Sequence, residues 1–435
     1  MAQQEALGAT AADLRRFYVS HLFEQMLPYW LERGIDDEYG AYLTGYSNDG
    51  RTLLHHYKLP WSQGRFVWLW SRLASQFPAH PLAGRFVDYA RSGADFLRTH
   101  ARLPNGRVAF TLDRDGIPIL LDKDGRPRAA RPGETYDSST YADLYVVYGL
   151  SEYARVAEHG PSLEFAWDLY WSVADRYRQG RFRTDPYPTP PGYRAHGVPM
   201  FMLDTGRELA VSAEQLDMRD TAALRALVAE LVGEVMDRQR QDDDVIIELL
   251  GRDGGVRPTK LGTYVNPGLM FQDMWFIMHQ AEEAGDRRRI EQAARVVRRA
   301  CELAWDEEYG GLLQFVHREG GPPRGEVPPE EAGHPMLANL DANWDGKFYW
   351  VHTEALYALL LSYFHTGETW AADWYRRVHE YTFRVFPREE PGQEWINIRN
   401  RDGTPSTKPA AVPVKDPFHA PRDLLHSIAL LERWS

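Results

Sequence analysis

Helical periodicity recurs along almost the whole chain of 435 residues and constrains its fold more than any other feature. Apolar residues return at i, i+3 and i+4 in about twelve segments, the spacing that gives an amphipathic helix one apolar face. No sustained run of alternating apolar and polar residues competes with them. We therefore predict an all-α chain. The predicted helices span 12–32, 62–77, 81–100, 139–158, 161–178, 200–213, 218–238, 267–284, 286–305, 349–366, 368–386 and 419–434.

The segments between the helices resemble one another. DDEYGAYLTGYSNDGR at 36–51, WDEEYGGLLQFVHREG at 305–320 and GQEWINIRNRDG at 392–403 each begin with an acidic or Gly turn, and NGRVAFTLDRDG at 105–116 is a looser copy. Their Asp-Gly turns are typical of tight β-hairpins. A recurring helix–loop–helix unit indicates a closed array. Twelve helices in six pairs predict an (α/α)6 barrel with short hairpins on one side, and no Ser- or Gly-rich linker divides residues 1–435 into several domains.

Composition limits the partners that the chain can have. The net charge of −12 argues against nucleic acid or an acidic membrane surface as the main partner. The single cysteine, Cys301, excludes an internal disulfide and a cysteine-based metal site. The first residues lack the apolar core of a secretory signal, and no apolar run reaches the roughly 20 residues that span a bilayer. We expect a cytoplasmic protein.

Two helix-opening stretches carry polar side chains that suit a small-molecule site. In KLPWSQGRFVWLWSRL, Arg65 offers a fixed cation that could polarise a carbonyl or enediolate oxygen, although it could equally pair with a loop carboxylate. In DGKFYWVHTEALYALLLSYF, Glu354 lies near a helix N-terminus, where a carboxylate is also a plain partner of the helix dipole. For His352 in the same stretch we favour a structural role.

A third stretch, VKDPFHAPRDLLHSIALL, places His419 just before Pro421, a natural first-turn residue. His419 would then lie at the N-terminal end of the last helix, beneath the loops. Histidine is the side chain best suited to proton transfer near neutral pH, and the alternative is a capping histidine.

These stretches, with SSTYADLYVVYGLSEYA, GVPMFMLDTGREL, WDEEYGGLLQF and PFHAPRDLL, run in order along nearly the whole chain. Together they resemble the N-acylglucosamine 2-epimerase family, which includes cellobiose 2-epimerases and aldose–ketose isomerases. The resemblance implies an (α/α)6 barrel without a metal or redox cofactor. It also implies a reducing sugar as substrate, which reacts in its ring-opened form through a cis-enediolate.

The resemblance also implies roles for individual residues. Arg65 would contact the C1 and C2 oxygens of the sugar. Glu354 would bind hydroxyls or orient a histidine, and His419 would be one of two acid–base histidines. With Arg65, Glu354 and His419 as the catalytic candidates, the substrate-binding candidates are Trp61, Tyr141 (the pocket tyrosine), Trp350 (the stacking platform), Gln272 and Asp273.

One motif departs from the family pattern. Where the family has Pro-Gly-His-x-x-Glu-Trp, this chain reads PGLMFQDMW, so that Leu269 replaces the second histidine and Gln272 the glutamate. A third histidine found in some members is also absent, although His196 lies just upstream of its place. A single histidine suits a 1,2 aldose–ketose shift on one face better than 2-epimerisation, which normally needs groups on both faces. Asp273, on the helical face of Leu269, could compensate.

Three functions therefore remain open. The first is a sugar isomerase or 2-epimerase, which we favour. The second is a glycoside hydrolase that uses Asp273 and Glu354 as two carboxylates facing one pocket. The third is a sugar-binding protein without turnover. In each case the partner is a small-molecule sugar, and the sequence decides neither which sugar nor whether the protein is a monomer or a homodimer.

Overall fold

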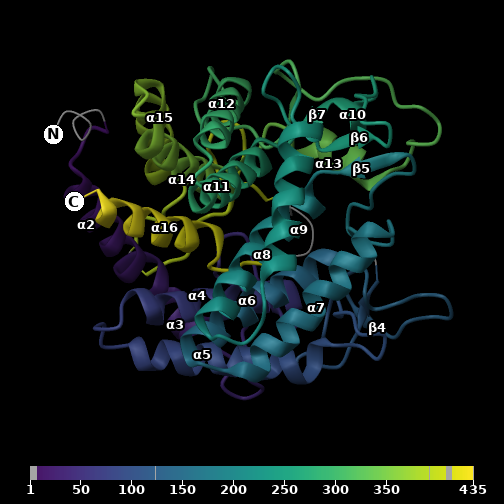
Figure 1. Cartoon of the computed structure of the whole chain (residues 1–435), viewed down its shortest axis with the longest axis vertical. Coiled ribbons are helices and arrows are strands. Elements are labelled where there is room, and N and C mark those ends of the chain that lie inside the picture. The colour runs from purple at the N-terminus through teal and green to yellow at the C-terminus, as the bar shows by residue number, and fades with distance from the viewer. Residues whose placement is uncertain (1–6, 123, 391, 408–413, 435) are drawn as a thin grey trace.

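The computed structural model describes residues 7–122, 124–390, 392–407 and 414–434. Its main helices form two concentric layers (Figure 1). Each inner helix contacts the next around a ring, and the last returns to the first. The inner helices are α4 (Pro60–Gln76), α6 (Thr140–Ala157), α8 (Gly197–Gln215), α11 (Pro267–Ala284), α14 (Tyr349–Thr366) and α16 (His419–Arg433).

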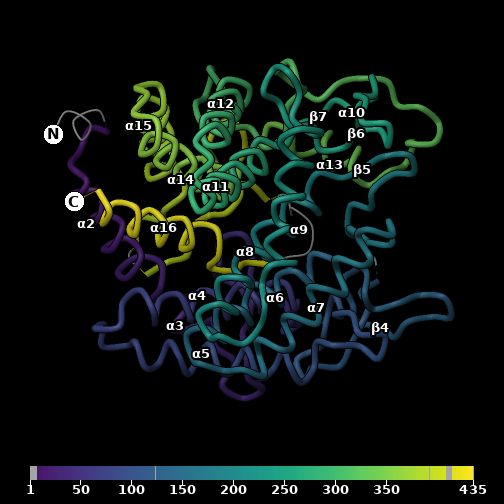
Figure 2. The backbone as a smooth tube through the Cα atoms, in the orientation of Figure 1, coloured from purple at the N-terminus to yellow at the C-terminus, as the bar shows by residue number. Residues whose placement is uncertain are grey.

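An outer helix packs against each inner one. The outer layer consists of α2 (Ala11–Ser20), continued by η1 (His21–Met26) and α3 (Leu27–Arg33), α5 (Ala83–Phe96) with η2 (Leu97–Ala101), α7 (Gly160–Arg178), α9 (Ala222–Gly233) with η3 (Glu234–Gln239), α12 (Arg287–Ala304) and α15 (Thr369–Val385). Figure 2 shows α2 beside α16, so the first and last helices close the ring. The predicted (α/α)6 barrel is confirmed, and the predicted helix 267–284 has the bounds of α11.

Burial separates the two layers. Nearly every residue of α14 is buried, as expected for a helix enclosed on all sides. Outer helix α12 buries only one face and presents its arginines to solvent. No helix among the described residues is both long enough and apolar enough to cross a lipid bilayer.

Short antiparallel ladders lie between the helices, but only some are local hairpins. β1 (Gly45–Tyr46) pairs with β2 (Leu53–His55), and β3 (Leu120–Leu121) pairs with β4 (Pro127–Arg128). Three other ladders connect segments that are distant in sequence. They are β5 (Tyr193–Ala195) with β6 (Leu249–Gly251), β7 (Tyr264–Val265) with β8 (Val316–His317), and β9 (Lys347–Phe348) with β10 (Ile398–Arg399).

Each of these three ladders joins the segment that enters an inner helix to the segment that leaves the next outer helix. Strands β8 and β10 therefore pair outside their own loops, because both ends of a helix pair return to the same end of the barrel. Single antiparallel bridges, between Trp305 and Leu312 and between Arg399 and Pro405, are all that remains of the predicted local pairing in these two loops among the described residues. A smaller apolar cluster packs α13 (Pro335–Asn343) and the short α10 (Lys260–Thr263) near β5–β6 and β7–β8. This cluster supports the loops above the inner helices.

A buried ion pair explains why two of the loops resemble each other. Lys58, two residues before α4, places Nζ 3.2 Å from Asp36 Oδ2, and both side chains are almost fully buried. Arg114 donates to the same carboxylate with Nε at 3.0 Å and Nη2 at 2.9 Å. Asp36 is the first acidic residue of the DDEYG turn at 36–40, so it links that turn to the start of an inner helix.

A second copy of this arrangement precedes α14. Lys347 Nζ lies 2.9 Å from Asp306 Oδ2, again with both side chains buried. Arg401 donates to Asp306 with Nε and Nη2, each at 2.9 Å. The repeated acidic turn is therefore a device that fixes the entry of α4 and of α14.

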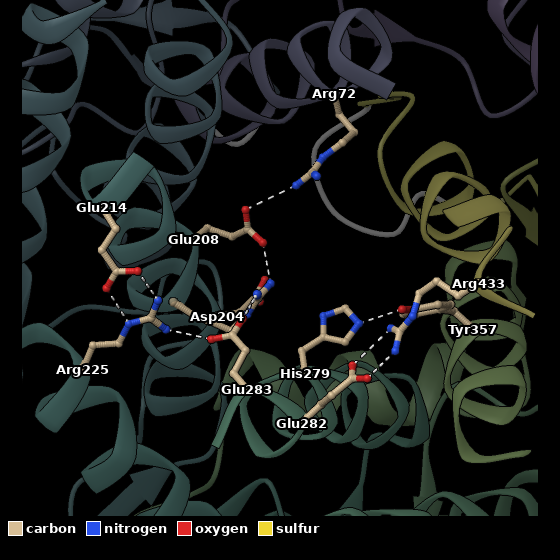
Figure 3. Close-up of polar contacts among 11 residues, drawn as sticks. Arg72, Asp204, Glu208, Glu214, Arg225, His279, Glu282, Glu283, Tyr357 and Arg433 are labelled. Atoms are coloured by element: carbon tan, nitrogen blue, oxygen red, sulfur yellow. Dashed lines mark hydrogen bonds and ion pairs between the residues drawn. The ribbon is translucent and has the colours of Figure 1, made fainter. Parts of the chain in front are cut away.

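A network of ion pairs connects the inner helices away from the loops (Figure 3). Arg207 of α8 bonds to Glu208 and, at 2.8 Å, to Glu283 of α11, while Arg72 of α4 lies 3.4 Å from Glu208. Beside them, His279 Nε2 lies 2.7 Å from Tyr357 Oη. These ion pairs connect neighbouring inner helices of the ring. None of their residues lines the cavity described in the next section.

Candidate active site

A cavity of about 720 Å³ lies at the loop end of the barrel, within the usual size range of small-molecule pockets. Every inner helix contributes a residue from its first two turns, because the inner helices all begin at this end. Aromatic rings form much of the wall. The contributing residues include Arg65 of α4, Tyr141 of α6, Phe201 of α8, Leu269 of α11, Trp350 of α14 and His419 of α16.

His419 is the first residue of α16, and its Nδ1 lies 2.5 Å from Glu354 Oε1. An ionised carboxylate only accepts hydrogen bonds, so Nδ1 carries the proton and Nε2 keeps its lone pair. Among the described residues none hydrogen bonds to Nε2, and the side chain is 11% exposed to the cavity. Burial lowers the pKa of His419 to about 4, outweighing the contribution of Glu354. The imidazole of His419 is therefore neutral and held in one orientation.

Glu354 is buried behind His419 and does not line the cavity. Its Oε1 also accepts from Arg422, and its Oε2 accepts from Trp275 Nε1 at 2.7 Å. Burial opposes ionisation, but Arg422 and His419 hold the pKa of Glu354 below its usual range. Gln272 lines the cavity beside this pair, and with its amide turned so that the oxygen faces Arg422, that oxygen accepts from Nη2 at 2.9 Å. Of the two roles that the resemblance implied for Glu354, the geometry favours orienting a histidine.

Arg65 is held rigidly on the cavity wall. Its Nη1 lies 3.2 Å from Asp416 Oδ2, and its Nη2 donates to Tyr145 Oη at 2.8 Å. The guanidinium lies over the rings of Trp61 and Tyr145, at 4.6 and 4.3 Å from their centroids. Burial opposes the charge, but Tyr145 and Asp416 raise the pKa of Arg65. From the sequence, Arg65 was either a cation of a small-molecule site or the partner of a loop carboxylate. The structure is compatible with both, because Arg65 is paired with Asp416 and also lines the cavity.

Trp350 and Tyr141 are placed by close approach to glycines. The ring centroid of Trp350 lies 5.4 Å from that of His419, and a Cβ on Gly268 would come within 2.4 Å of the Trp350 ring. Tyr141 packs its hydroxyl against Gly197, where a Cβ would lie 2.5 Å from Oη. Both rings line the cavity, with Trp350 next to the imidazole.

Asp273 does not line the cavity, which differs from its predicted contact with substrate. It lies one helical turn deeper than Leu269, fully buried, with Oδ2 2.7 Å from His196 Nε2. Leu269 itself lines the cavity. Leu269 and Asp273 lie one turn apart on the same face of α11, as the helical spacing predicted. The carboxylate of Asp273, however, is bound by His196, which immediately precedes α8.

The sequence analysis missed Glu248, which lines the cavity and lies 3.3 Å through Oε1 from His196 Nδ1. Burial lowers the pKa of His196, but Glu248 and Asp273 outweigh it and raise that pKa to about 10. The available signal was a lone acid within the apolar run VIIELL. Arg422 was also missed, although it follows His419 by three residues, one helical turn.

His352 has the structural role expected for it. Its Nδ1 donates to the Phe348 carbonyl at 2.8 Å, and its Nε2 accepts from the Leu312 amide at 2.8 Å. Burial lowers its pKa to about 3. In the described part of the chain, no cluster of three or more His, Cys, Asp or Glu side chains is arranged to hold a metal ion.

The sequence profile of the N-acylglucosamine 2-epimerase (GlcNAc 2-epimerase) family matches residues 40–420. The chain belongs to this family. It is 28% identical over 416 residues to the N-acylglucosamine 2-epimerase of Mus musculus, covering 93% of this chain and 89% of the mouse protein. Membership of the N-acylglucosamine 2-epimerase family supports an isomerase activity on a carbohydrate.

Solved structures agree on the fold of this family member. The cellobiose 2-epimerase from Bacillus thermoamylovorans superposes with a TM-score of 0.75 at 16% identity, covering 96% of this chain and 99% of that one. A D-mannose isomerase superposes with a TM-score of 0.70 at 13% identity, covering 97% and 98%. At such identities the likeness establishes the barrel.

Proposed function

We propose that the protein interconverts reducing sugars or amino sugars at C1 and C2 through a ring-opened cis-enediolate, with His419 as an acid–base group. The observation that carries the proposal is the contact between His419 Nδ1 and Glu354 Oε1, which fixes the tautomer and leaves Nε2 facing the cavity. The substrates named for relatives in this family are sugars of these kinds.

The reaction begins with transfer of the C2 proton of the open-chain sugar to His419 Nε2. The electron pair of the broken C–H bond forms the C1–C2 double bond, and the carbonyl oxygen becomes an oxyanion. Arg65 is the stabiliser of this oxyanion, because its guanidinium is fixed by Asp416 and Tyr145 before substrate arrives. Return of a proton to C1 gives the ketose, and return to C2 from the other face gives the epimer.

Aromatic side chains and amides supply binding. Trp350, beside His419, is suited to stack on a sugar face, since aromatic rings bind the apolar faces of sugar rings. Trp61 and Tyr141 line the wall, and the amide of Gln272 is a polar contact for hydroxyls. Asp273 acts from behind, through His196.

A glycoside hydrolase built on Asp273 and Glu354 is less well supported. Two hydrolytic carboxylates must both face the scissile bond, at separations of about 5 to 9.5 Å. Asp273 and Glu354 are each buried outside the cavity lining and occupied by a histidine. Binding without turnover stays open as the alternative, and the same experiment tests it.

The experiment is proton NMR in heavy water with glucose, mannose, fructose, N-acetylglucosamine, N-acetylmannosamine and cellobiose. We expect deuterium at C1 or C2 of at least one sugar, lost in His419→Ala. The matched control is His80→Ala, because His80 lies between α4 and α5 and does not line the cavity. Ligand-induced stabilisation with no exchange in any sugar would identify a binding protein instead.

A further inference from the structure

The cavity contains a second titratable group that is backed by fixed partners. We propose that Glu248 is the proton-transfer group on the face of the cavity opposite His419, so that the protein inverts the configuration at C2. This inference rests on the proposed enediolate reaction. It adds to that reaction a second acid–base group and the identity of the product.

Two pairs of a histidine and a glutamate lie at the cavity, and in each pair one side chain lines the cavity and the other lies behind it. In the first, His419 faces the cavity and Glu354 stands behind it, 2.5 Å away. In the second, Glu248 faces the cavity and His196 stands behind it, with Nδ1 3.3 Å from Oε1. Asp273 completes the second arrangement at 2.7 Å from His196 Nε2. Carboxylate and imidazole have exchanged places between the two.

The positions of the two groups in the ring place them across the cavity from one another. His419 opens α16, whereas Glu248 immediately precedes β6, the strand paired with the segment that enters α8. Around the ring, α11 and α14 lie between α8 and α16 on one side, and α6 and α4 lie between them on the other. A sugar bound in the cavity therefore has His419 and Glu248 on different sides.

The carboxylate of Glu248 is available for this role. One oxygen is near the buried imidazole, and within the described chain no residue donates a hydrogen bond to Oε2. His196 is enclosed, with a fully buried side chain, so it cannot reach the substrate itself. It acts as a positioning residue, and Asp273 holds it in turn. Leu269, which also lines the cavity, adds only an apolar surface.

The proton and electron balance of the step closes without a further reactant. His419 removes the C2 proton, and the electron pair forms the enediolate. Glu248 then takes the Nδ1 proton of the His196 imidazolium and gives it to C2 from the opposite face; the new C–H bond takes the pair, and the C1 carbonyl re-forms. The protein ends with imidazolium at His419, neutral imidazole at His196 and carboxylate at Glu248. That form carries the reverse reaction with the roles exchanged, and proton exchange with water restores the first form.

The test is Glu248→Gln, followed by NMR in heavy water with the sugar that the wild-type protein converts. We expect epimer formation to fall by about 100-fold or more, the contribution of an acid–base group. Deuterium should still enter C2 with retained configuration, because His419 can return deuterium to the face from which it took the proton. Glu331→Gln is the matched control, since Glu331 is equally buried and accepts from Tyr193 Oη outside the cavity lining.

A second variant separates chemistry from folding. Glu248→Ala with added formate should recover part of the epimerisation, since a small carboxylate can occupy the vacated space; a purely structural role gives no recovery. Epimer formed by Glu248→Gln at the wild-type rate overturns this inference alone, as does a wild-type protein that yields only ketose. A wild-type protein without His419-dependent exchange overturns the proposed function, and this inference with it.

Discussion

His419 Nδ1 and Glu354 Oε1 lie 2.5 Å apart at the inner end of the cavity, and the same carboxylate oxygen accepts from Arg422. Because Glu354 is paired with a permanent cation, it stays ionised, and burial outweighs this carboxylate and keeps the imidazole neutral. Burial lowers the pKa of His419 from 6.5 to about 4. Neutral imidazole is thus the resting form over most of the accessible pH range.

The pH dependence of the rate follows from this pKa. We expect kcat/KM to stay level as pH falls from 8 to about 5, and to decline with an apparent pKa of about 4. The measurement is the initial rate of the sugar interconversion across this range. A decline centred near 6.5 would show that His419 is not shielded as described.

The same pKa affects stability. The pKa of His419 is lower in the folded state than in the unfolded state. Above pH 6.5 the side chain is neutral in both states, so it has no effect on the free energy of unfolding there. As pH falls from 6.5 to about 4, the unfolded state takes up the proton first, and the folded state loses about 3 kcal/mol relative to it. Urea unfolding at pH 7 and pH 5 should show a steeper loss in the wild type than in His419→Ala. Equal losses would contradict this assignment.

Arg65 should not be replaceable by lysine. Its guanidinium uses Nη1 toward Asp416 and Nη2 toward Tyr145 while lying over aromatic rings, and a lysine ammonium cannot reproduce this fork. We expect kcat to fall by about 10²- to 10³-fold in both Arg65→Lys and Arg65→Ala, the usual loss of an oxyanion donor. Steady-state kinetics measure it, with circular dichroism as a check of folding. Activity in Arg65→Lys near that of wild type would argue for a simple charge effect.

Gly268 should be intolerant of alanine. A Cβ there would lie 2.4 Å from the Trp350 ring, which must move away and disturb its contact with His419. We expect a raised KM and a loss of about 1–3 kcal/mol of stability, the usual cost of overpacking. Gly84→Ala in α5 is the control, because nothing lies within 4 Å of its Cβ position. The KM and the thermal unfolding of both variants are measured. Equal values for Gly268→Ala and Gly84→Ala would exclude a steric clash with Trp350 as the cause.

Asp306 should contribute far more to stability than exposed acids do. Asp306→Asn leaves buried Lys347 without its carboxylate, and removing one partner of a buried pair costs about 3–5 kcal/mol. Asp88→Asn breaks an exposed pair with Arg91 and should cost less than about 1 kcal/mol. Denaturant unfolding gives both values. The folded structure lowers the pKa of Asp306 from 3.8 to about 2. The stabilisation by this ion pair is therefore fully present above pH 3.8 and is lost as the pH falls through 2.

The sequence by itself determined the helices, the barrel and several of the residues on the cavity wall. Helix formation depends on contacts three and four residues apart, so periodicity located α11 at 267–284 without knowledge of its neighbours. The ordered motifs identified the family, and residues at helix starts, such as Arg65 and His419, could be placed because inner helices begin at one end of the barrel.

Only the tertiary structure decided that Glu248 lines the cavity and that Asp273 does not. Asp273 shares a helical face with Leu269, yet it is buried against His196, while Glu248, 25 residues before Asp273 in the sequence, lines the wall. Likewise, the ladders β7–β8 and β9–β10 join strands that no local pattern connects. Burial depth and pairing depend on how separate helices pack around the ring, and local spacing carries no information about those long-range contacts.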